Sequence, residues 1–163
     1  MLRTRSRRPL HDHLLAVYAR RGWRWREEGD PPVLVSELSG PLGSWLMYVQ
    51  VVEEAKLLVV YSVLPAVVPS GRRDAVAEFV TRANYGLSLG NLEMDFDDGE
   101  LRAKVALAVG DHPPDDALIE RLVRVSGRLV ERYLPGIEAV VDGTDPLAAA
   151  SAVGADPNDV VVA

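Results

Sequence analysis

Apolar residues recur along the chain with two different periods, and the changes between them predict the order of helices and strands. The first stretch has the helical period, with Leu10 and Leu14 four residues apart on one face. Pro9 is suited to a first helical turn, and Gly22 to the residue that ends a helix. These signals predict a helix over Pro9–Arg21.

Three segments with a period of two come next, separated by turn signals at Asp30-Pro31-Pro32, Gly40-Pro41 and Glu53-Glu54. The second segment alternates over two faces, with one set Trp45, Met47, Val49 and Val51 and the other Ser44, Leu46, Tyr48 and Gln50. The third, residues 57–64, is apolar on both faces. This pattern predicts a central strand, or one whose second face a partner covers.

Helical spacing returns over residues 69–84, and Asn84-Tyr85-Gly86 is expected to end that helix. Residues 92–109 then alternate as a β-hairpin around a two-residue loop, Asp98-Gly99. The expected register pairs Asp95 with Arg102, Glu93 with Lys104 and Phe96 with Leu101, and leaves Asp97 facing Glu100 as a like-charge exception.

A long last helix is predicted to open at Pro113-Pro114-Asp115-Asp116 and to end soon after Pro135-Gly136. Its first apolar stripe is Leu118, Leu122, Val125, Leu129 and Tyr133, and a second stripe beside it is Ile119, Val123, Val130 and Leu134. Two adjacent stripes make an apolar arc wider than one sheet contact requires, which indicates a protein interface.

The element order predicts an α+β fold: an antiparallel sheet of about five strands packed with helices, in the order α-β-β-β-α-β-β-α. We assign residues 9–141 to this domain, residues 1–8 to a disordered basic leader, and residues 142–163 to a mobile acidic tail. A tail that folds back over an apolar groove is the alternative.

Composition narrows the function classes. The 163 residues suit one domain, and they include no cysteine, which excludes disulfides, cysteine-ligated zinc, iron–sulfur clusters and thiol catalysis. The longest apolar runs, such as residues 63–68, are far shorter than a membrane span. We therefore expect a soluble, cytoplasmic protein with no membrane partner.

Charge is distributed unevenly. Residues 1–30 hold eight arginines and four acids, a local charge of +4, so the remainder carries −10 of the total of −6. This basic region is the basis of an alternative function, single-stranded nucleic-acid binding through Arg20, Arg21, Trp23, Arg24, Trp25 and Arg26. The acidic remainder would repel phosphate, which makes nucleic acid the less favoured partner.

No motif indicates catalysis or a cofactor. The acids from Asp95 to Glu100 lack the spacing of a calcium loop, because glycine is fifth and position twelve is Ala106. His11 and His13 are expected to be exposed and solvated. There is no nucleophile elbow, phosphate loop or dinucleotide fingerprint. We therefore predict a non-enzymatic protein with no metal and no cofactor.

The middle of the chain resembles the bacterial YbjN family in the order and spacing of Asn84-Tyr85-Gly86, Gly90, Leu92-Glu93-Met94-Asp95 and Asp98-Gly99-Glu100. The resemblance extends over residues 9–141. It implies a fold similar to that of type III secretion chaperones, which are small acidic proteins that dimerise and hold extended partner segments. The family is labelled a sensory transduction regulator and has no established catalytic residues, so none is carried over. The arginine-rich leader and the acidic tail depart from a plain member.

The function predicted on these grounds is a protein-binding module, chaperone-like or a regulatory adaptor, that acts as a homodimer and holds a segment of an unidentified partner protein. The apolar excess on the last helix and on residues 57–64 supports this prediction. The candidate contact residues are Trp45, Leu46, Tyr48, Leu58, Val60, Ile119, Val123 and Val130.

Overall fold

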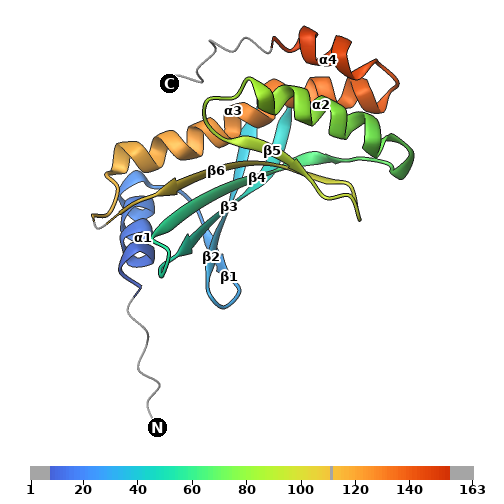
Figure 1. Ribbon diagram of the computed structural model, residues 1–163. Coiled ribbons are helices and arrows are strands. Elements are labelled where there is room, and N and C mark those ends of the chain that lie inside the picture. The colour runs from blue at the N-terminus through green and yellow to red at the C-terminus, as the bar shows by residue number, and fades with distance from the viewer. Residues whose placement is uncertain (1–7, 111, 155–163) are drawn as a thin grey trace.

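The computed structural model describes residues 8–110 and 112–154 and has an α+β architecture, as the sequence predicts (Figure 1). In chain order its elements are α1 (Pro9–Arg21), β1 (Arg26–Glu28), β2 (Val33–Gly40), β3 (Gly43–Val52), β4 (Leu57–Val67), the short 3-10 helix η1 (Ser70–Arg72), α2 (Arg73–Tyr85), β5 (Asn91–Met94), β6 (Glu100–Ala108), α3 (Asp116–Val141) and α4 (Pro146–Ala152).

The described strands form one antiparallel sheet in the order β1-β2-β3-β4-β6-β5. The sheet has six strands rather than about five, because β1 is an additional edge strand. Its three residues, Arg26, Glu27 and Glu28, are all charged and exposed, so the sequence has no apolar alternation here that would predict a strand. The apolar strand β4 is central, which confirms one of the two readings of residues 57–64.

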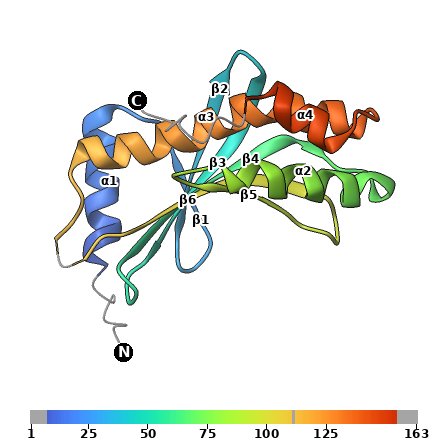
Figure 2. The same ribbon diagram turned by 45° about the horizontal axis from the view of Figure 1, so that its top comes forward.

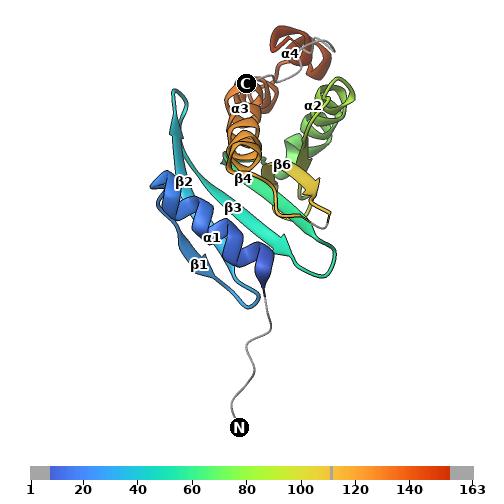
Figure 3. The same cartoon turned by 90° about the vertical axis from the view of Figure 1, so that its left-hand side faces the viewer.

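The helices pack on one face of the sheet. Figure 2 shows α3 running from α1 at one end of the molecule to α4 at the other, and Figure 3 shows α2, α3 and α4 on the same side of β4 and β6. α1 joins the same core through Leu14, Val17 and Tyr18, all 0% exposed. The sheet is therefore covered from one side.

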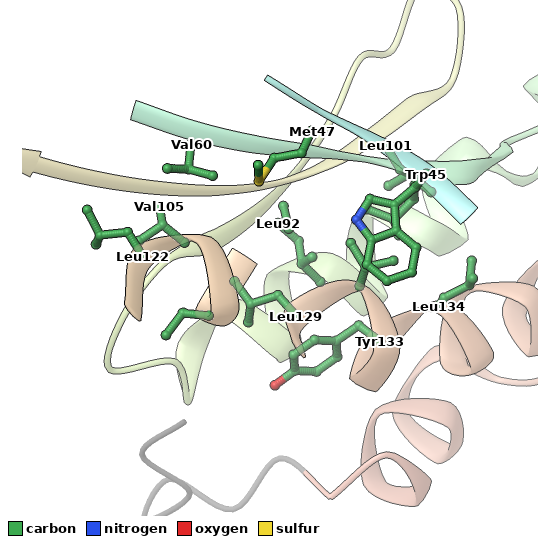
Figure 4. Close-up of a cluster of buried hydrophobic side chains, with 14 of the residues drawn as sticks. Trp45, Met47, Val60, Leu92, Leu101, Val105, Leu122, Leu129, Tyr133 and Leu134 are labelled. Carbon is green, nitrogen blue, oxygen red and sulfur yellow. The ribbon is translucent and has the colours of Figure 1, made fainter. Parts of the chain in front are cut away.

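The core forms where α3 crosses the middle of the sheet (Figure 4). Leu122, Leu129 and Tyr133 of α3 face buried side chains from β3, β4, β5 and β6. Within this apolar contact, the Ser126 hydroxyl donates to Ser62 Oγ of β4 at 2.7 Å, and both residues are 0% exposed. This hydrogen bond satisfies the two buried hydroxyls together and fixes the position of α3 along β4.

α3 does not end near Pro135-Gly136, as the sequence predicts, but continues to Val141. Pro135 is exposed, while Gly136 is buried against Phe79 of α2. A Cβ on Gly136 would lie 2.6 Å from the Phe79 ring, so the missing side chain lets α2 and α3 approach closely. Glycine here is a packing residue and not a helix end.

The predicted mobile tail is wrong for residues 146–152, which form α4. The Asp145 side chain caps this helix by accepting from Ala148 N at 3.0 Å, and Pro146 occupies its first turn. Ala149 and Ala150 are 3% and 4% exposed and belong to the core beside α2 and α3. The remaining tail from residue 155 and residues 1–7 of the predicted leader lie outside the described residues.

The observed register of the β5–β6 hairpin differs from the predicted one. Glu93 lies opposite Arg102 and Asn91 opposite Lys104, a shift of two residues that keeps the paired side chains on their expected faces. Met94 takes the predicted place of Phe96 opposite Leu101, and Phe96 lies in the turn, 52% exposed. The loop is longer than two residues, because Asp95 N donates to Glu100 O and Gly99 N to Asp95 O, each at 2.9 Å. The Asp95 and Asp98 carboxylates stabilise this turn by accepting from the backbone two residues on, at 2.8 Å each.

Two glycines of α3 provide a matched test of this packing. Gly136→Ala should lower the free energy of unfolding by about 1–3 kcal/mol, because the new methyl group overlaps the Phe79 ring. Gly127→Ala should be neutral or stabilising by up to about 1 kcal/mol, because its Cβ would lie 3.6 Å from Trp45 and alanine favours the helix. Urea unfolding of both variants measures the difference. Equal stability of the two variants would contradict the packing described.

Candidate protein-binding face

The face of the sheet turned away from the helices carries the second set of strand side chains. Val35 of β2 lies opposite Tyr48 of β3, and Tyr48 lies opposite Tyr61 of β4. Further along the strands, Glu37 lies opposite Leu46 and Val63 lies opposite Arg102, and the β3–β4 pairs end one residue before Leu46 and Val63, at Met47 opposite Ser62. The side chains Val35, Leu46, Tyr48, Val59, Tyr61 and Val63 form what we call the open-face band.

The open-face band lies outside the core cluster that the helices cover. Val35 and Val59 are only 1% and 4% exposed, but neither belongs to that cluster, so they are buried by neighbours on their own face. Leu46 is 36% exposed, and Tyr48 and Tyr61 are half-buried. The accessible part of the band is therefore Leu46, Tyr48, Tyr61 and Val63, and such a combination of aliphatic and tyrosine side chains is typical of protein interfaces.

Charged side chains border the band at the β6 side. The Glu93 carboxylate accepts from Arg102 Nε at 2.8 Å and from Lys104 Nζ at 2.9 Å, and the Arg102 guanidinium lies 4.6 Å from the centre of the Tyr61 ring. Partial burial alone would raise the pKa of Glu93, but the hydrogen bonds from Lys104, Arg102 and Asn91 outweigh that effect and lower it. This edge is therefore a rigid, ion-paired border.

At the β2 side the border is acidic. Glu37 is exposed and forms no ion pair within the described part of the chain, whereas Arg26 donates to Glu28 at 2.6 Å on the neighbouring strand β1. Glu37 on β2 and Arg102 on β6 thus place opposite charges at the two ends of the band.

The structure divides the predicted contact residues into two groups. Leu46 and Tyr48 lie on the open-face band, and Val123 is half-buried on α3, on the other side of the sheet. The other five cannot touch a partner in this fold, because they are at most 5% exposed: Trp45, Leu58, Val60, Ile119 and Val130.

The inference from the second stripe of α3 was wrong for a physical reason. α3 contacts the sheet, α2 and α4, so most of the wide apolar arc is buried within the chain itself, and Leu118 and Val123 are the members that stay partly exposed. Sequence reasoning also missed Tyr61 and Val63, which are half-buried on the open face, whereas Val35 and Val59 on the same face are buried. The signal that could have identified the β4 members was the two-sided apolar pattern of residues 57–64.

The nucleic-acid candidates are largely engaged within the protein. Arg20 forms a bidentate pair with Asp116 at 3.0 and 2.6 Å, and Arg21 contacts Glu120 at 3.1 Å. The hydrogen bonds from Arg20 lower the pKa of Asp116. Trp23 and Trp25 lie edge-on to Tyr18, at 5.0 and 5.7 Å between ring centres. Arg24 is the member of this group for which the described residues provide no ion pair.

The histidines do not all have the solvated environment expected from sequence. His11 is 5% exposed, and its Nε2 lies 2.7 Å from Glu27 Oε1, because α1 packs over β1. His13 Nε2 lies 2.8 Å from Pro114 O. Among residues 8–110 and 112–154, no cluster of three or more His, Asp or Glu side chains could hold a metal ion.

Comparison with known proteins places this geometry in a family. Fold and open face together define a small α+β protein with a candidate binding surface on an antiparallel sheet. The chain belongs to the YbjN family, whose model, described as "Putative bacterial sensory transduction regulator", matches residues 10–139. None of the described helices has the length and apolar character needed to cross a membrane.

A solved structure supports the same fold. The crystal structure titled "YbjN, a putative transcription regulator from E. coli" is similar with a TM-score of 0.56 and 15% sequence identity, over 78% of this chain and 89% of that chain. No curated protein matches this chain significantly. The expected family resemblance and α+β fold are thus confirmed.

The Glu93 cluster predicts a pH dependence of stability. Since its carboxyl pKa is lowered from 4.5 in the folded state, its ion pairs stabilise the fold above pH 4.5 and that contribution is lost as the pH falls below this value. Glu93→Gln should reduce the free energy of unfolding by up to about 1 kcal/mol at neutral pH. The difference from wild type should disappear in acid.

Urea unfolding over a pH series measures this effect. Glu54→Gln, in the exposed turn between β3 and β4, is the control and should follow wild type throughout. A deficit in Glu93→Gln that persists unchanged into acid would show that its carboxylate does not stabilise the fold through charge.

Proposed function

We propose that this protein is a non-enzymatic regulatory adaptor that forms a homodimer through the open-face band and holds a segment of a partner protein. The observation that carries the proposal is the uncovered apolar band on a sheet whose other face is packed with helices. The family description supports a regulatory role in general. The engagement of Glu93 and His11 in paired contacts supports a non-enzymatic role.

Charge placement supports a second copy as the occupant of the band. A two-fold axis parallel to the strands, between β3 and β4, would lay the two bands face to face and place Glu37 of each copy near Arg102 of the other. The two sheets would then pack as in a β-sandwich, with Tyr48, Tyr61 and Leu46 in the centre. Glu37 has no ion pair of its own to lose on association.

The partner segment is expected to be basic. The chain carries a net charge of −6, and opposite charge on a partner increases its association rate and its selectivity. The ion pairs of Arg20, Arg21 and Arg26 with acids favour this assignment over a nucleic-acid partner.

Two leucines of equal exposure test the dimer. Leu46 and Leu118 are each 36% exposed, but Leu46 lies on the band and Leu118 in the first turn of α3. Light scattering over a dilution series should show dimeric wild type, a folded monomer for Leu46→Asp and an unchanged dimer for Leu118→Asp. Circular dichroism checks the fold of each variant.

A charge exchange tests the orientation of the two copies. Glu37→Arg should weaken the dimer about tenfold or more by facing Arg102, and adding Arg102→Glu should restore much of the affinity. Monomeric wild type at all concentrations would refute the dimer. If the losses of dimer affinity from Glu37→Arg and Arg102→Glu simply add in the double variant, the proposed two-fold axis is refuted.

Peptides test the partner-holding role separately. An extended peptide of alternating lysine and leucine should bind the wild-type protein, and its affinity should fall as salt is added. The same peptide with glutamate in place of lysine should not bind. Equal binding of both peptides, or of neither, would contradict a basic partner segment.

A further inference from the structure

A cavity of about 480 Å³ lies on the helix side of the sheet, where the end of α1 approaches the N-terminal third of α3. Its volume is within the range of small-molecule sites. The apolar part of its lining comes from four separate elements or their ends: Trp23, Leu38, Met47 and Val123. Trp23 and Val123, which the sequence placed in two different functional hypotheses, thus meet at one site.

Two buried hydroxyls in the lining have no well-formed hydrogen bond within the described part of the chain. Tyr18 is 0% and Ser36 is 7% exposed, and the two hydroxyls lie near each other without a hydrogen bond of good geometry to any described residue. Burial raises the pKa of Tyr18 to about 12, and the neighbouring Ser36 hydroxyl lowers it only in part, so the phenol remains a neutral donor. Buried hydroxyls almost always have a partner, and leaving them without one costs stability.

The charged residues that line the cavity are two arginines, Arg24 and Arg124, and two glutamates, Glu37 and Glu120, so the charge of its rim depends on where the two carboxylates lie. Glu120 is bonded to Arg21 at 3.1 Å and to Arg124 at 2.7 Å, so one carboxylate is shared by two arginines. Arg24 also lines the cavity and has no ion pair within the described residues. Glu37 borders it too, but alternation on β2 directs its side chain to the open face.

We propose that this cavity binds a small amphiphile with a flat apolar body and a carboxylate. The body would lie among Trp23, Leu38 and Val123, and polar atoms of the ligand would satisfy the Tyr18 and Ser36 hydroxyls. Arg24 and the partly compensated arginines at the rim favour a carboxylate over a neutral or cationic group. This site is on the opposite face from the open-face band and does not depend on the dimer.

Naphthaleneacetate and its neutral analogue naphthaleneethanol are suitable probes. Calorimetric titration of the full chain should show saturable binding of one probe per chain, with the acid tighter than the alcohol. Amide chemical shifts should move at the end of α1, on β2 and in the N-terminal third of α3. Val123→Trp, which fills the cavity, should lower the affinity for both probes at least about tenfold.

Two further variants keep the test independent of folding defects. Arg24→Gln, at an exposed position, should lower the affinity for naphthaleneacetate several-fold and leave the affinity for naphthaleneethanol unchanged. Leu46→Asp, on the open face, should bind both probes as wild type does, whatever its effect on the dimer. No saturable binding of either probe at millimolar concentration would overturn the proposal. Binding that Leu46→Asp removes and Val123→Trp leaves intact would also overturn it.

Discussion

Burial of α3 on two sides is the constraint on which the rest of this structure depends. The helix is apolar over a wide arc, so it needs the sheet beneath it and α2 and α4 on its other flank. The Ser126–Ser62 hydrogen bond positions it along β4, and Gly136 lets the Phe79 ring of α2 pack directly against its backbone. The helices therefore all cover one face of the sheet. The other face has no helix over it, and its apolar side chains lie at the surface.

One-sided packing produces two surfaces that share the same strands. Leu46 and Met47 are adjacent in β3, yet Leu46 contributes to the open-face band and Met47 lines the cavity beside α1 and α3. The band has opposite charges at its ends, from Glu37 and Arg102, which suits a symmetric contact. The cavity has unpartnered hydroxyls and a basic rim, which suits a small anionic molecule. The charged and hydroxyl groups at each surface, rather than its apolar area alone, therefore distinguish the band from the cavity.

The errors of sequence reasoning have specific causes. The hairpin register failed by two residues because the Asp95 and Asp98 carboxylates favour a longer turn through local hydrogen bonds, although the alternation still placed each side chain on its face. α4 escaped notice because its buried residues, Ala149 and Ala150, are too small to produce an apolar period. Without α4 and the contact at Gly136, the apolar arc of α3 looked like an interface between proteins.

Alternation and helical spacing determined the α+β class and the two faces of β3, because these depend on the backbone period of each element, and Pro9 and Gly22 set the ends of α1. Only the tertiary structure decided which apolar residues remain at the surface, because that depends on which elements cover which face. It also brought Trp23, Ser36 and Val123, far apart in the chain, around one cavity. Such proximity arises from packing between elements, which no local pattern of residues encodes.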